Sequence, residues 1–225
     1  MRIVLHLGRL AAIALGLALL VSCATPAPAP EAPPASQKSP IPIAEQETKS
    51  LARYGDILDM VANTPASAIA HQLREEYKRL IKDYPDSYFA EESYFRLMKS
   101  AITVPWPPDY DSAEMYYDEY TKNYPHPRLI VLMNDFMVRT YDNYKQWDRL
   151  VRFLQPYVKR YSETRNAEPL YFMYYYSEAK FALKDYEEAR RGYQTVINVG
   201  PETHEASVSR ERLIELDKAV KGDAK

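Results

Sequence analysis

The sequence predicts an all-α protein built as an α-α superhelix, with about four helix pairs and a C-terminal capping helix. Three observations support this prediction. Apolar residues recur with the spacing of amphipathic helices over nearly all of residues 44–225. Only four glycines follow residue 43, and alternating β-branched runs with Asn-Gly or Asp-Gly turns are missing. A ladder of apolar residues also repeats every 37 to 40 positions, as expected of stacked helix pairs.

The chain begins with a segment typical of a secretory signal peptide. Arg2 and Arg9 precede an uncharged apolar run over residues 10–21, which is too short to span a bilayer as a helix. A positive start, a short apolar run and a small residue before the cleavage point define such signals. We therefore expect residues 1–22 to be a signal peptide that is removed.

Cys23 is the only cysteine, and it directly follows Leu20, Val21 and Ser22. This order of aliphatic, variable and small residues before a cysteine resembles the signal of bacterial lipoproteins. The resemblance implies that Cys23 carries a covalent diacylglycerol and an acyl chain such as palmitate, which together hold the protein on a membrane. With Ala24 as the next residue, it further implies the periplasmic face of the outer membrane. A buried or incidental cysteine is the alternative.

Residues 24–43 hold seven of the seventeen prolines and show no apolar periodicity. Such a tract favours extended polyproline II, at about 3.1 Å per residue, and acts as a semi-rigid spacer. A Pro-rich docking motif for a partner is the alternative. The chain therefore divides into the signal peptide, a lipidated cysteine with a Pro/Ala-rich tether over 23–43, and a repeat domain over 44–225.

The repeat domain opens with a predicted helix over residues 44–62. Thr64 and Pro65 have the residue types of an N-cap and a first helical position, so a partner helix is expected to begin there. First helices of the next three pairs are predicted over 87–103, 128–144 and 170–183, and a capping helix over 203–220. The apolar side chains expected to bury these first helices include Leu51, Tyr54, Leu58 and Val61, then Phe89, Ser93, Leu97 and Ala101, then Leu132, Phe136, Val138 and Tyr141, then Met173, Tyr176, Ala179 and Leu183.

The second helix of each pair carries the ladder. In the clearest copy, Ala189 is followed by Tyr193, Val196 and Pro201. The first three positions lie on one helical face, and the small residue lets a neighbouring helix approach closely. A proline at the twelfth position ends the helix. The other copies are Leu73-Tyr77-Leu80-Pro85, Ala113-Tyr117-Tyr120-Pro125 and Leu150-Leu154-Tyr157-Ser162.

Two segments depart from the ladder. Pro156 falls inside the second helix of the third pair, so a kink or a break is expected near Gln155. The insertion Thr103–Asp111, with the sequence TVPWPPDYD, is expected to form a rigid loop that exposes Trp106.

The ladder resembles the second half of a tetratricopeptide repeat, although its copies are spaced more widely than the usual ~34 residues. Two turns resemble more narrowly those of the lipoprotein D subunits of the β-barrel assembly machinery. They are Tyr84-Pro85-Asp86-Ser87-Tyr88 with Glu91 and Glu92, and residues 117–124 with Pro125-His126-Pro127. The resemblance implies a scaffold that holds other assembly proteins at the outer membrane.

Repeats of this type present a concave groove lined by the first helix of each pair. The chain has 20 tyrosines, and aromatic side chains are enriched at protein interfaces. The alternative is that most of them fill the core. The candidate partner-binding residues are Glu92, Arg96 and Lys99 in the second pair, Asp135 and Arg139 in the third, Tyr174, Glu178 and Phe181 in the fourth, and Trp106 in the inserted loop.

No catalytic or metal site is expected. The four histidines are dispersed, and neither a metal-ligand spacing nor a nucleophile motif is present. Adjacent acidic residues such as Glu187 and Glu188 point their side chains in different directions on a helix, so we expect them to lie on solvent-exposed faces. The formal net charge is −2, and removal of the signal peptide makes it more negative, which disfavours nucleic-acid binding. We expect no enzymatic activity and no cofactor other than the lipid on Cys23.

The sequence thus predicts a lipid-anchored periplasmic scaffold that binds partner proteins in cell-envelope or outer-membrane protein assembly. The alternative is an accessory lipoprotein of a cell-wall enzyme or an export system, with glycan binding through Tyr and Trp side chains.

Overall fold

The computed structural model describes residues 40–65, 68–164 and 169–223. Within these ranges the protein contains nine α-helices and no strand, which confirms the predicted all-α class. The chain divides after Lys38, and the second unit, Ser39–Lys225, is compact and contains every described helix. The helices are α1 Ile43–Asn63, α2 Ala70–Asp83, α3 Tyr88–Thr103, α4 Tyr110–Asn123, α5 Ile130–Asn143, α6 Trp147–Thr164, α7 Leu170–Ala182, α8 Tyr186–Val199 and α9 His204–Asp223.

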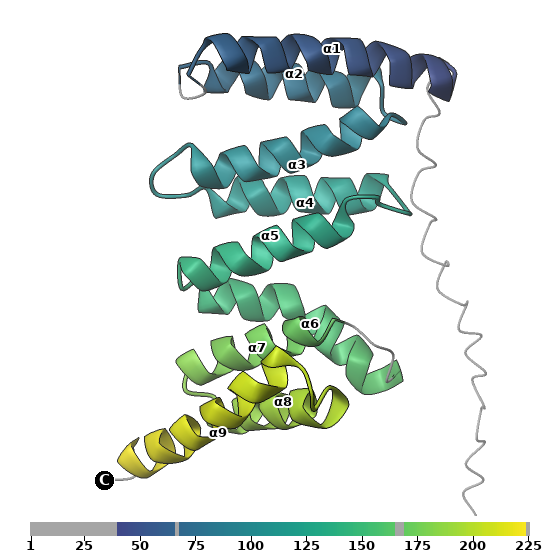
Figure 1. The fold of residues 1–225 in the computed structure, drawn as a ribbon. Helices are drawn as coiled ribbons and strands as arrows, with labels where there is room; N and C mark the ends of the chain where they lie inside the picture. The colour runs from purple at the N-terminus through teal and green to yellow at the C-terminus, as the bar shows by residue number, and fades with distance from the viewer. Residues whose placement is uncertain (1–39, 66–67, 165–168, 224–225) are drawn as a thin grey trace, which may run out of the picture. The chain divides into compact units, whose positions relative to one another are not determined.

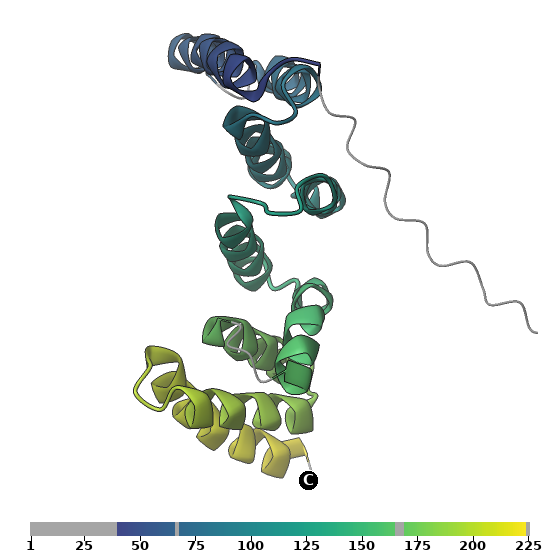
Figure 2. The same ribbon diagram turned by 90° about the vertical axis from the view of Figure 1, so that its right-hand side faces the viewer.

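The helices of the second unit form four successive pairs followed by α9 (Figure 1). Each odd-numbered helix packs on the next odd-numbered helix, from α1 on α3 to α7 on α9. Figure 2 shows the first helices of the pairs on one side and α2, α4 and α6 on the other. This two-layer stacking of helix pairs is the arrangement expected of an α-α superhelix.

Short polar side chains begin several of the helices. Ser87 accepts a hydrogen bond from the backbone N–H of Ala90 at 3.1 Å, and Asp109 accepts one from Ser112 at 3.0 Å. Asp185 caps α8 in the same way. Each cap satisfies one of the backbone donors that a helix N-terminus leaves unpaired. The observed starts of α3, α4 and α8 therefore follow from local sequence.

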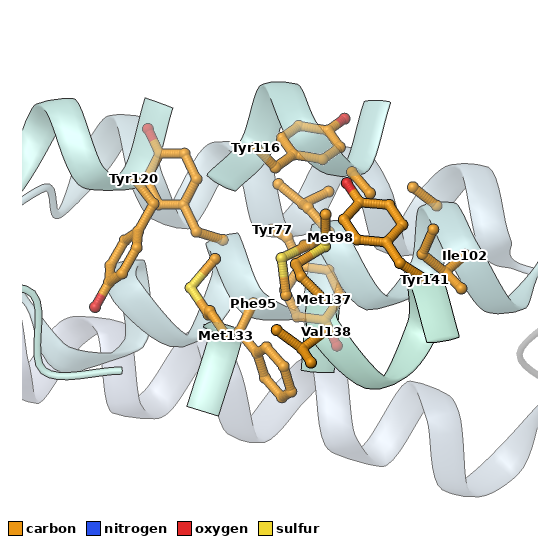
Figure 3. Close-up of a cluster of buried hydrophobic side chains, with 14 of the residues drawn as sticks. Tyr77, Phe95, Met98, Ile102, Tyr116, Tyr120, Met133, Met137, Val138 and Tyr141 are labelled. Atoms are coloured by element: carbon orange, nitrogen blue, oxygen red, sulfur yellow. The ribbon is translucent and has the colours of Figure 1, made fainter. Parts of the chain in front are cut away.

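Most of the predicted ladder residues lie in the core, and Leu73, Tyr117 and Tyr157 are partly buried against it. Ala189, Tyr193 and Val196 are fully buried in α8, and Leu150 and Leu154 are fully buried in α6. Figure 3 shows how large side chains fill the space between α3, α4 and α5, where Tyr120 lies near Met133 and Tyr141 lies near Met137. The same junction is joined by a hydrogen bond from the Tyr141 hydroxyl of α5 to Glu114 of α4.

The first helix does not bury the face that the sequence predicted. Of its four expected core residues only Tyr54 is buried, whereas Leu51, Leu58 and Val61 are exposed. The buried face of α1 is formed by Gln46, Ser50, Tyr54 and Ile57. The prediction failed because α1 carries apolar residues on two faces, and helical periodicity cannot tell which one is covered.

Three further expectations are corrected. Thr64 ends α1 in an extended conformation and α2 begins at Ala70, so Thr64 and Pro65 terminate a helix and do not start one. A residue before proline is biased away from helical angles, which explains this stop. In α5, Leu132 is exposed and Met133 and Met137 are buried in its place. Leu183 is likewise exposed, because α7 ends at Ala182.

Pro156 does not break its helix. The α6 helix continues through Pro156 to Thr164, and its ribbon bends along its length in Figure 1. Proline removes one backbone hydrogen bond and crowds the preceding turn, so a bend without a break is its usual effect.

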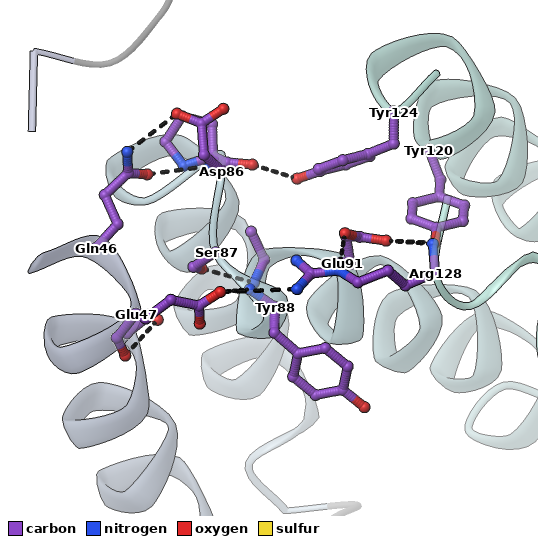
Figure 4. A network of polar contacts seen from close by, with 12 residues as sticks. Gln46, Glu47, Asp86, Ser87, Tyr88, Glu91, Tyr120, Tyr124 and Arg128 are labelled. Carbon is purple, nitrogen blue, oxygen red and sulfur yellow. Dashed lines mark hydrogen bonds and ion pairs between the residues drawn. The ribbon is translucent and has the colours of Figure 1, made fainter. Parts of the chain in front are cut away.

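Two glutamates, the buried Glu91 and the half-buried Glu114, join successive helices. Glu91 in α3 accepts hydrogen bonds from the Tyr120 hydroxyl at 2.7 Å and from Arg128 Nε at 2.6 Å (Figure 4). Glu114 in α4 accepts in the same way from the Tyr141 hydroxyl and from Arg149, each at 2.7 Å. Each of these Glu–Tyr–Arg triads therefore connects three consecutive parts of the chain.

The two turns that resemble the assembly lipoprotein are occupied by internal contacts. Gln46 of α1 exchanges two hydrogen bonds with Asp86, each of 3.0 Å (Figure 4). The Tyr124 hydroxyl donates to the carbonyl of Pro85 at 2.7 Å. These residues therefore hold neighbouring pairs together.

Candidate protein-binding cleft

Eight of the nine candidate residues lie on α3, α5 and α7, the layer of first helices. The structure separates them into three groups with different degrees of exposure. Tyr174, Glu178 and Phe181 border a substantial cleft, whereas Glu92 is buried and Lys99, Arg139 and Trp106 are exposed.

In α3, Glu92 is buried and fully engaged. Its carboxylate accepts hydrogen bonds from Arg96 Nε at 2.8 Å and from the Tyr54 hydroxyl at 3.3 Å. Arg96 Nε also reaches the Tyr54 oxygen at 3.2 Å. Lys99, two turns from Glu92, is exposed. Glu92 and Arg96 therefore attach α3 to α1, and only Lys99 is freely accessible.

In α5, Asp135 and Arg139 form an ion pair across one helical turn. The Arg139 Nε lies 2.8 Å from an Asp135 oxygen, and the guanidinium side chain is 63% exposed. Exposed pairs of this kind contribute at most about 0.5 kcal/mol to stability. They remain on the surface as a polar patch.

The cleft has a volume of about 540 Å³, within the range of ordinary ligand sites. Its walls come from the α5–α6 turn, α7, the α7–α8 turn and α9. The lining residues are Asp142, Lys145, Trp147, Tyr174, Tyr175, Glu178, Phe181, Ala182, Lys184, Tyr186, Arg212 and Ala219.

At the floor of the cleft, Glu178 repeats the triad found between the earlier helices. It accepts hydrogen bonds from the Tyr193 hydroxyl at 2.6 Å and from Arg212 Nε at 3.0 Å. The carboxylate joins α7 to α8 and α9, so the cleft has a rigid base. Burial raises the pKa of Tyr174 to about 12, which keeps its hydroxyl neutral under physiological conditions.

Aromatic rings cover the walls. Tyr174 and Tyr175 have ring centroids 5.4 Å apart at an edge-on angle, and Phe181 lies 5.9 Å from Tyr186. Lys145 places its ammonium 4.8 Å from the centre of the Trp147 ring. The cleft thus combines flat apolar surfaces with charges of both signs.

Two lysines occupy equivalent and unusual positions at the rim. Lys145 and Lys184 have φ angles of 56° and 62°, and they follow Tyr144 and Leu183, the C-cap residues of α5 and α7. Each forms the left-handed residue of a C-cap, where glycine is the most frequent choice. A lysine at such a position is strained by roughly 1–2 kcal/mol. Strain of this kind concentrates at functional sites.

Sequence reasoning missed Lys145, Trp147, Tyr175 and Arg212. Lys145 and Lys184 are 39 positions apart, the same interval that separates the ladders of α6 and α8. This shared interval of 39 residues was the one sequence signal that could have identified the two lysines as equivalent positions. Trp147 at the start of α6 and Arg212 in α9 line the cleft because parts of the chain far apart in sequence lie together in the fold. A local sequence pattern cannot predict such a contact.

Trp106 forms a separate exposed feature in the loop between α3 and α4. Its side chain is 83% exposed, and its ring centroid lies 6.3 Å from that of Tyr144. Tyr144 also lies 6.3 Å from Tyr110. The three rings form an aromatic platform beside the α5–α6 turn.

The predictions for the N-terminal segment concern residues that the structure does not describe. Cys23, the signal peptide and the tether up to residue 39 lie outside the described residues. Across the described ranges, no helix is long and apolar enough to cross a membrane. The same residues hold no group of three or more His, Cys, Asp or Glu side chains placed to bind a metal ion.

Comparison of the chain with protein-family models, curated proteins and solved structures found no match.

Proposed function

We propose that this protein is a lipid-anchored scaffold on the periplasmic face of the outer membrane, where it binds partner proteins of cell-envelope or outer-membrane protein assembly. The lipoprotein-like order of residues before Cys23 supports the anchor and the location. The cleft bordered by α7 and α9 carries the binding role. The proposal assigns the chain no enzymatic activity, and it keeps the tetratricopeptide and assembly-lipoprotein identities as resemblances.

The cleft suits an extended or helical segment of another protein. Rigid aromatic side chains supply large contact areas with little loss of conformational freedom. Glu178, Lys145 and Arg212 provide charges of both signs that can fix the register of a bound segment. Because Glu178 is held by Tyr193 and Arg212, the site is preorganised, which reduces the entropy lost on binding.

The test is affinity capture of the membrane-extracted protein, followed by mass spectrometry of the bound proteins. The capture is repeated with Lys145→Glu, which reverses a charge at the rim, and with Lys122→Glu, which reverses an exposed charge in α4 away from the cleft. We expect a partner that is lost with the first variant and retained with the second. Equal capture by both variants would contradict the cleft as the binding site.

The identity of the partner decides the process. Recovery of barrel-assembly proteins would support a role in outer-membrane protein assembly. Recovery of cell-wall or export proteins would support the alternative, an accessory lipoprotein of those systems.

The aromatic platform around Trp106 favours a second candidate function, which is glycan binding within that alternative. Exposed rings can stack on the apolar faces of sugars, and the Trp106 ring has that of Tyr144 beside it. Binding of soluble peptidoglycan fragments, measured by calorimetry, should be lost in Trp106→Ala and retained in Phe181→Ala. No binding by the unmodified protein would exclude this candidate.

A further inference from the structure

The last helix, α9, is attached to the rest of the protein through few buried side chains (Figure 1). Within residues 204–222, only Ala206, Ser209 and Leu216 are buried. By comparison, α3 in the interior of the stack buries ten of its 16 residues. Most of the stability of a helix in a protein comes from packing of its apolar face. The α9 helix is therefore held less firmly than an internal helix.

The buried hydrophobic residues form two separate clusters that meet at α7. The larger cluster extends from α1 to α7. The smaller one consists of Ala189, Tyr193 and Leu216, with Tyr174 and Phe181 among the side chains packed against it. Because α9 contributes to the smaller cluster only, its release leaves the packing of α1 to α7 intact. Such an element can open locally without global unfolding.

A buried hydroxyl on α9 opposes docking of this helix. The Ser209 side chain is fully buried, and its Oγ has no hydrogen-bond partner among the described residues. Alanine would allow the same close approach of helices without an unpaired hydroxyl. A buried polar group without a partner destabilises the state that buries it. That state is the docked one, because release of α9 returns the hydroxyl to water.

The ion pair between α7 and α9 can separate without leaving a charge unpaired. Arg212 Nε of α9 donates to Glu178 of α7 at 3.0 Å. Glu178 also accepts from the Tyr193 hydroxyl of α8 at 2.6 Å, and Arg212 Nη1 also donates to Glu215 of its own helix at 2.6 Å. When α9 moves away, each charged group keeps its second partner. Release therefore avoids the large penalty of an uncompensated charge.

Movement of α9 changes the candidate cleft directly. Arg212 and Ala219 form the α9 wall, and the other lining residues belong to α5, α7, α8 and the turns between them or to the start of α6. Arg212 follows Ser209 by three positions, so the unpaired hydroxyl and the cleft wall move together. By contrast, α8 is closely packed on α7, because a Cβ on Gly192 would lie 2.0 Å from Ser177 Oγ.

We propose that α9 docks reversibly on α7 and α8, so that its docking completes the cleft and its release removes one wall. A protein segment held between α7 and α9 binds the docked state only, and therefore shifts the equilibrium toward that state. This coupling rests on the function proposed for the cleft. The reversible docking of α9 does not.

The first test is thiol labelling of the membrane-extracted full chain with a maleimide. Ser209→Cys places a thiol of similar size at the buried position, where it reacts only when α9 is released. Ser93→Cys, at a fully buried serine of α3, is the matched control. Ser207→Cys, at an exposed position of α9, gives the rate of an accessible thiol. Peptide mass spectrometry locates each adduct. Labelling at residue 209 should be at least about tenfold faster than at residue 93, and slower than at residue 207.

The second test asks whether the pair with Glu178 holds α9 in place. In the Ser209→Cys protein, Arg212→Gln should raise the labelling rate about tenfold, because hydrogen bonds between charged groups are the stronger ones. Asp217→Asn removes an exposed pair with Arg190 of α8 and should change the rate by less than about fivefold.

Amide hydrogen exchange tests the effect of the unpaired hydroxyl. Ser209→Ala should slow exchange over residues 206–216 at least about fivefold, because the docked state no longer buries that group. Ser207→Ala has the same gain in helix propensity and should slow exchange much less. Equal effects of the two variants would contradict the role given to Ser209.

The labelling rates decide the proposal. Equal rates at residues 93 and 209 would overturn it, because α9 would then leave only when the whole protein unfolds. Equal rates at residues 207 and 209 would also overturn it, because α9 would then not dock.

A partner captured through the cleft should slow labelling at residue 209. A partner whose capture needs Lys145 but which leaves this rate unchanged would overturn the coupling. Failure to capture any partner would count against the function proposed for the cleft, whereas the labelling rates would still decide the docking of α9.

Discussion

At the scale of residues, tyrosine hydroxyls determine how neighbouring helices are joined. Tyr120, Tyr141 and Tyr193 are fully buried, yet each donates a hydrogen bond to a glutamate on another helix. A phenylalanine would fill the same volume and leave those carboxylates short of a donor. The tyrosine-rich composition therefore reflects a core whose large side chains also satisfy buried polar groups.

Tyr120→Phe should destabilise the protein by about 1–3 kcal/mol. The Tyr120 hydroxyl donates to the buried Glu91 at 2.7 Å and accepts from the Leu129 N–H at 2.8 Å, so its removal leaves each of these groups without one partner. The change is measured by urea denaturation. Tyr144→Phe, at a 41% exposed ring, is the control and should change stability by less than about 0.5 kcal/mol. Equal effects of the two variants would mean that the triad contributes nothing.

Lys145→Gly and Lys184→Gly should each raise stability by up to about 1 kcal/mol, because glycine adopts a positive φ without strain. The same substitution at Lys122, which lies in α4, should lower stability by about 0.5–1 kcal/mol. Thermal denaturation of the three variants tests whether glycine raises the melting temperature at residues 145 and 184 and lowers it at residue 122. If the lysines serve the cleft, the two stabilised variants should also bind the captured partner more weakly. Destabilisation at residues 145 and 184 would contradict the strain argument.

At the scale of elements, local sequence patterns predicted where the helices begin and end. They did not always predict which face of a helix is buried. Caps such as Ser87 and the ladder around Ala189 placed α3 and α8 within a residue or two. The face of α1 was mistaken because Leu51 and Leu58 are as apolar as Ile57 on the opposite side. Which face is buried depends on the neighbours that a helix meets, and that information is not local.

Gly192→Ala should destabilise the α7–α8 pair by about 1–3 kcal/mol through overpacking. The new Cβ would lie 2.0 Å from Ser177 Oγ and 3.2 Å from Ser177 Cβ. Ser177→Ala removes the nearer atom, so the double variant should be more stable than the sum of the single effects predicts. A double-mutant cycle by urea denaturation measures this coupling, and additive effects would indicate that the two residues do not touch.

At the scale of the whole molecule, the fold could be predicted further than the site. A repeated sequence pattern predicts an α-α superhelix because each helix pair packs on the next in the same way. The predicted all-α class and the four helix pairs were confirmed. The cleft joins Lys145, Glu178 and Arg212 from three separate parts of the chain. Their meeting depends on the bend of α6 and the placement of α9. Sequence reasoning found Tyr174, Glu178 and Phe181 because α7 lies in the layer of first helices.

The buried tyrosines also make the molecule sensitive to alkaline pH. Burial raises the pKa of Tyr54, Tyr171 and Tyr174 to about 12, whereas an unfolded tyrosine titrates near its ordinary value of 10.0. Between these values the folded state binds more protons than the unfolded state, so stability must fall as the pH rises. The contribution is fully present below pH 10 and is lost as the pH passes through about 12.

Urea denaturation at a series of pH values, followed by tyrosinate absorbance, should therefore show a midpoint that declines steadily above pH 10. Tyr174→Phe removes one of the tyrosines whose pKa is raised and should make this decline shallower. A midpoint that stays constant between pH 10 and 12 would contradict the inward placement of these rings. Because Tyr54 lies on α1 and Tyr171 and Tyr174 lie on α7, the first and the fourth helix pairs should weaken together as these tyrosines ionise.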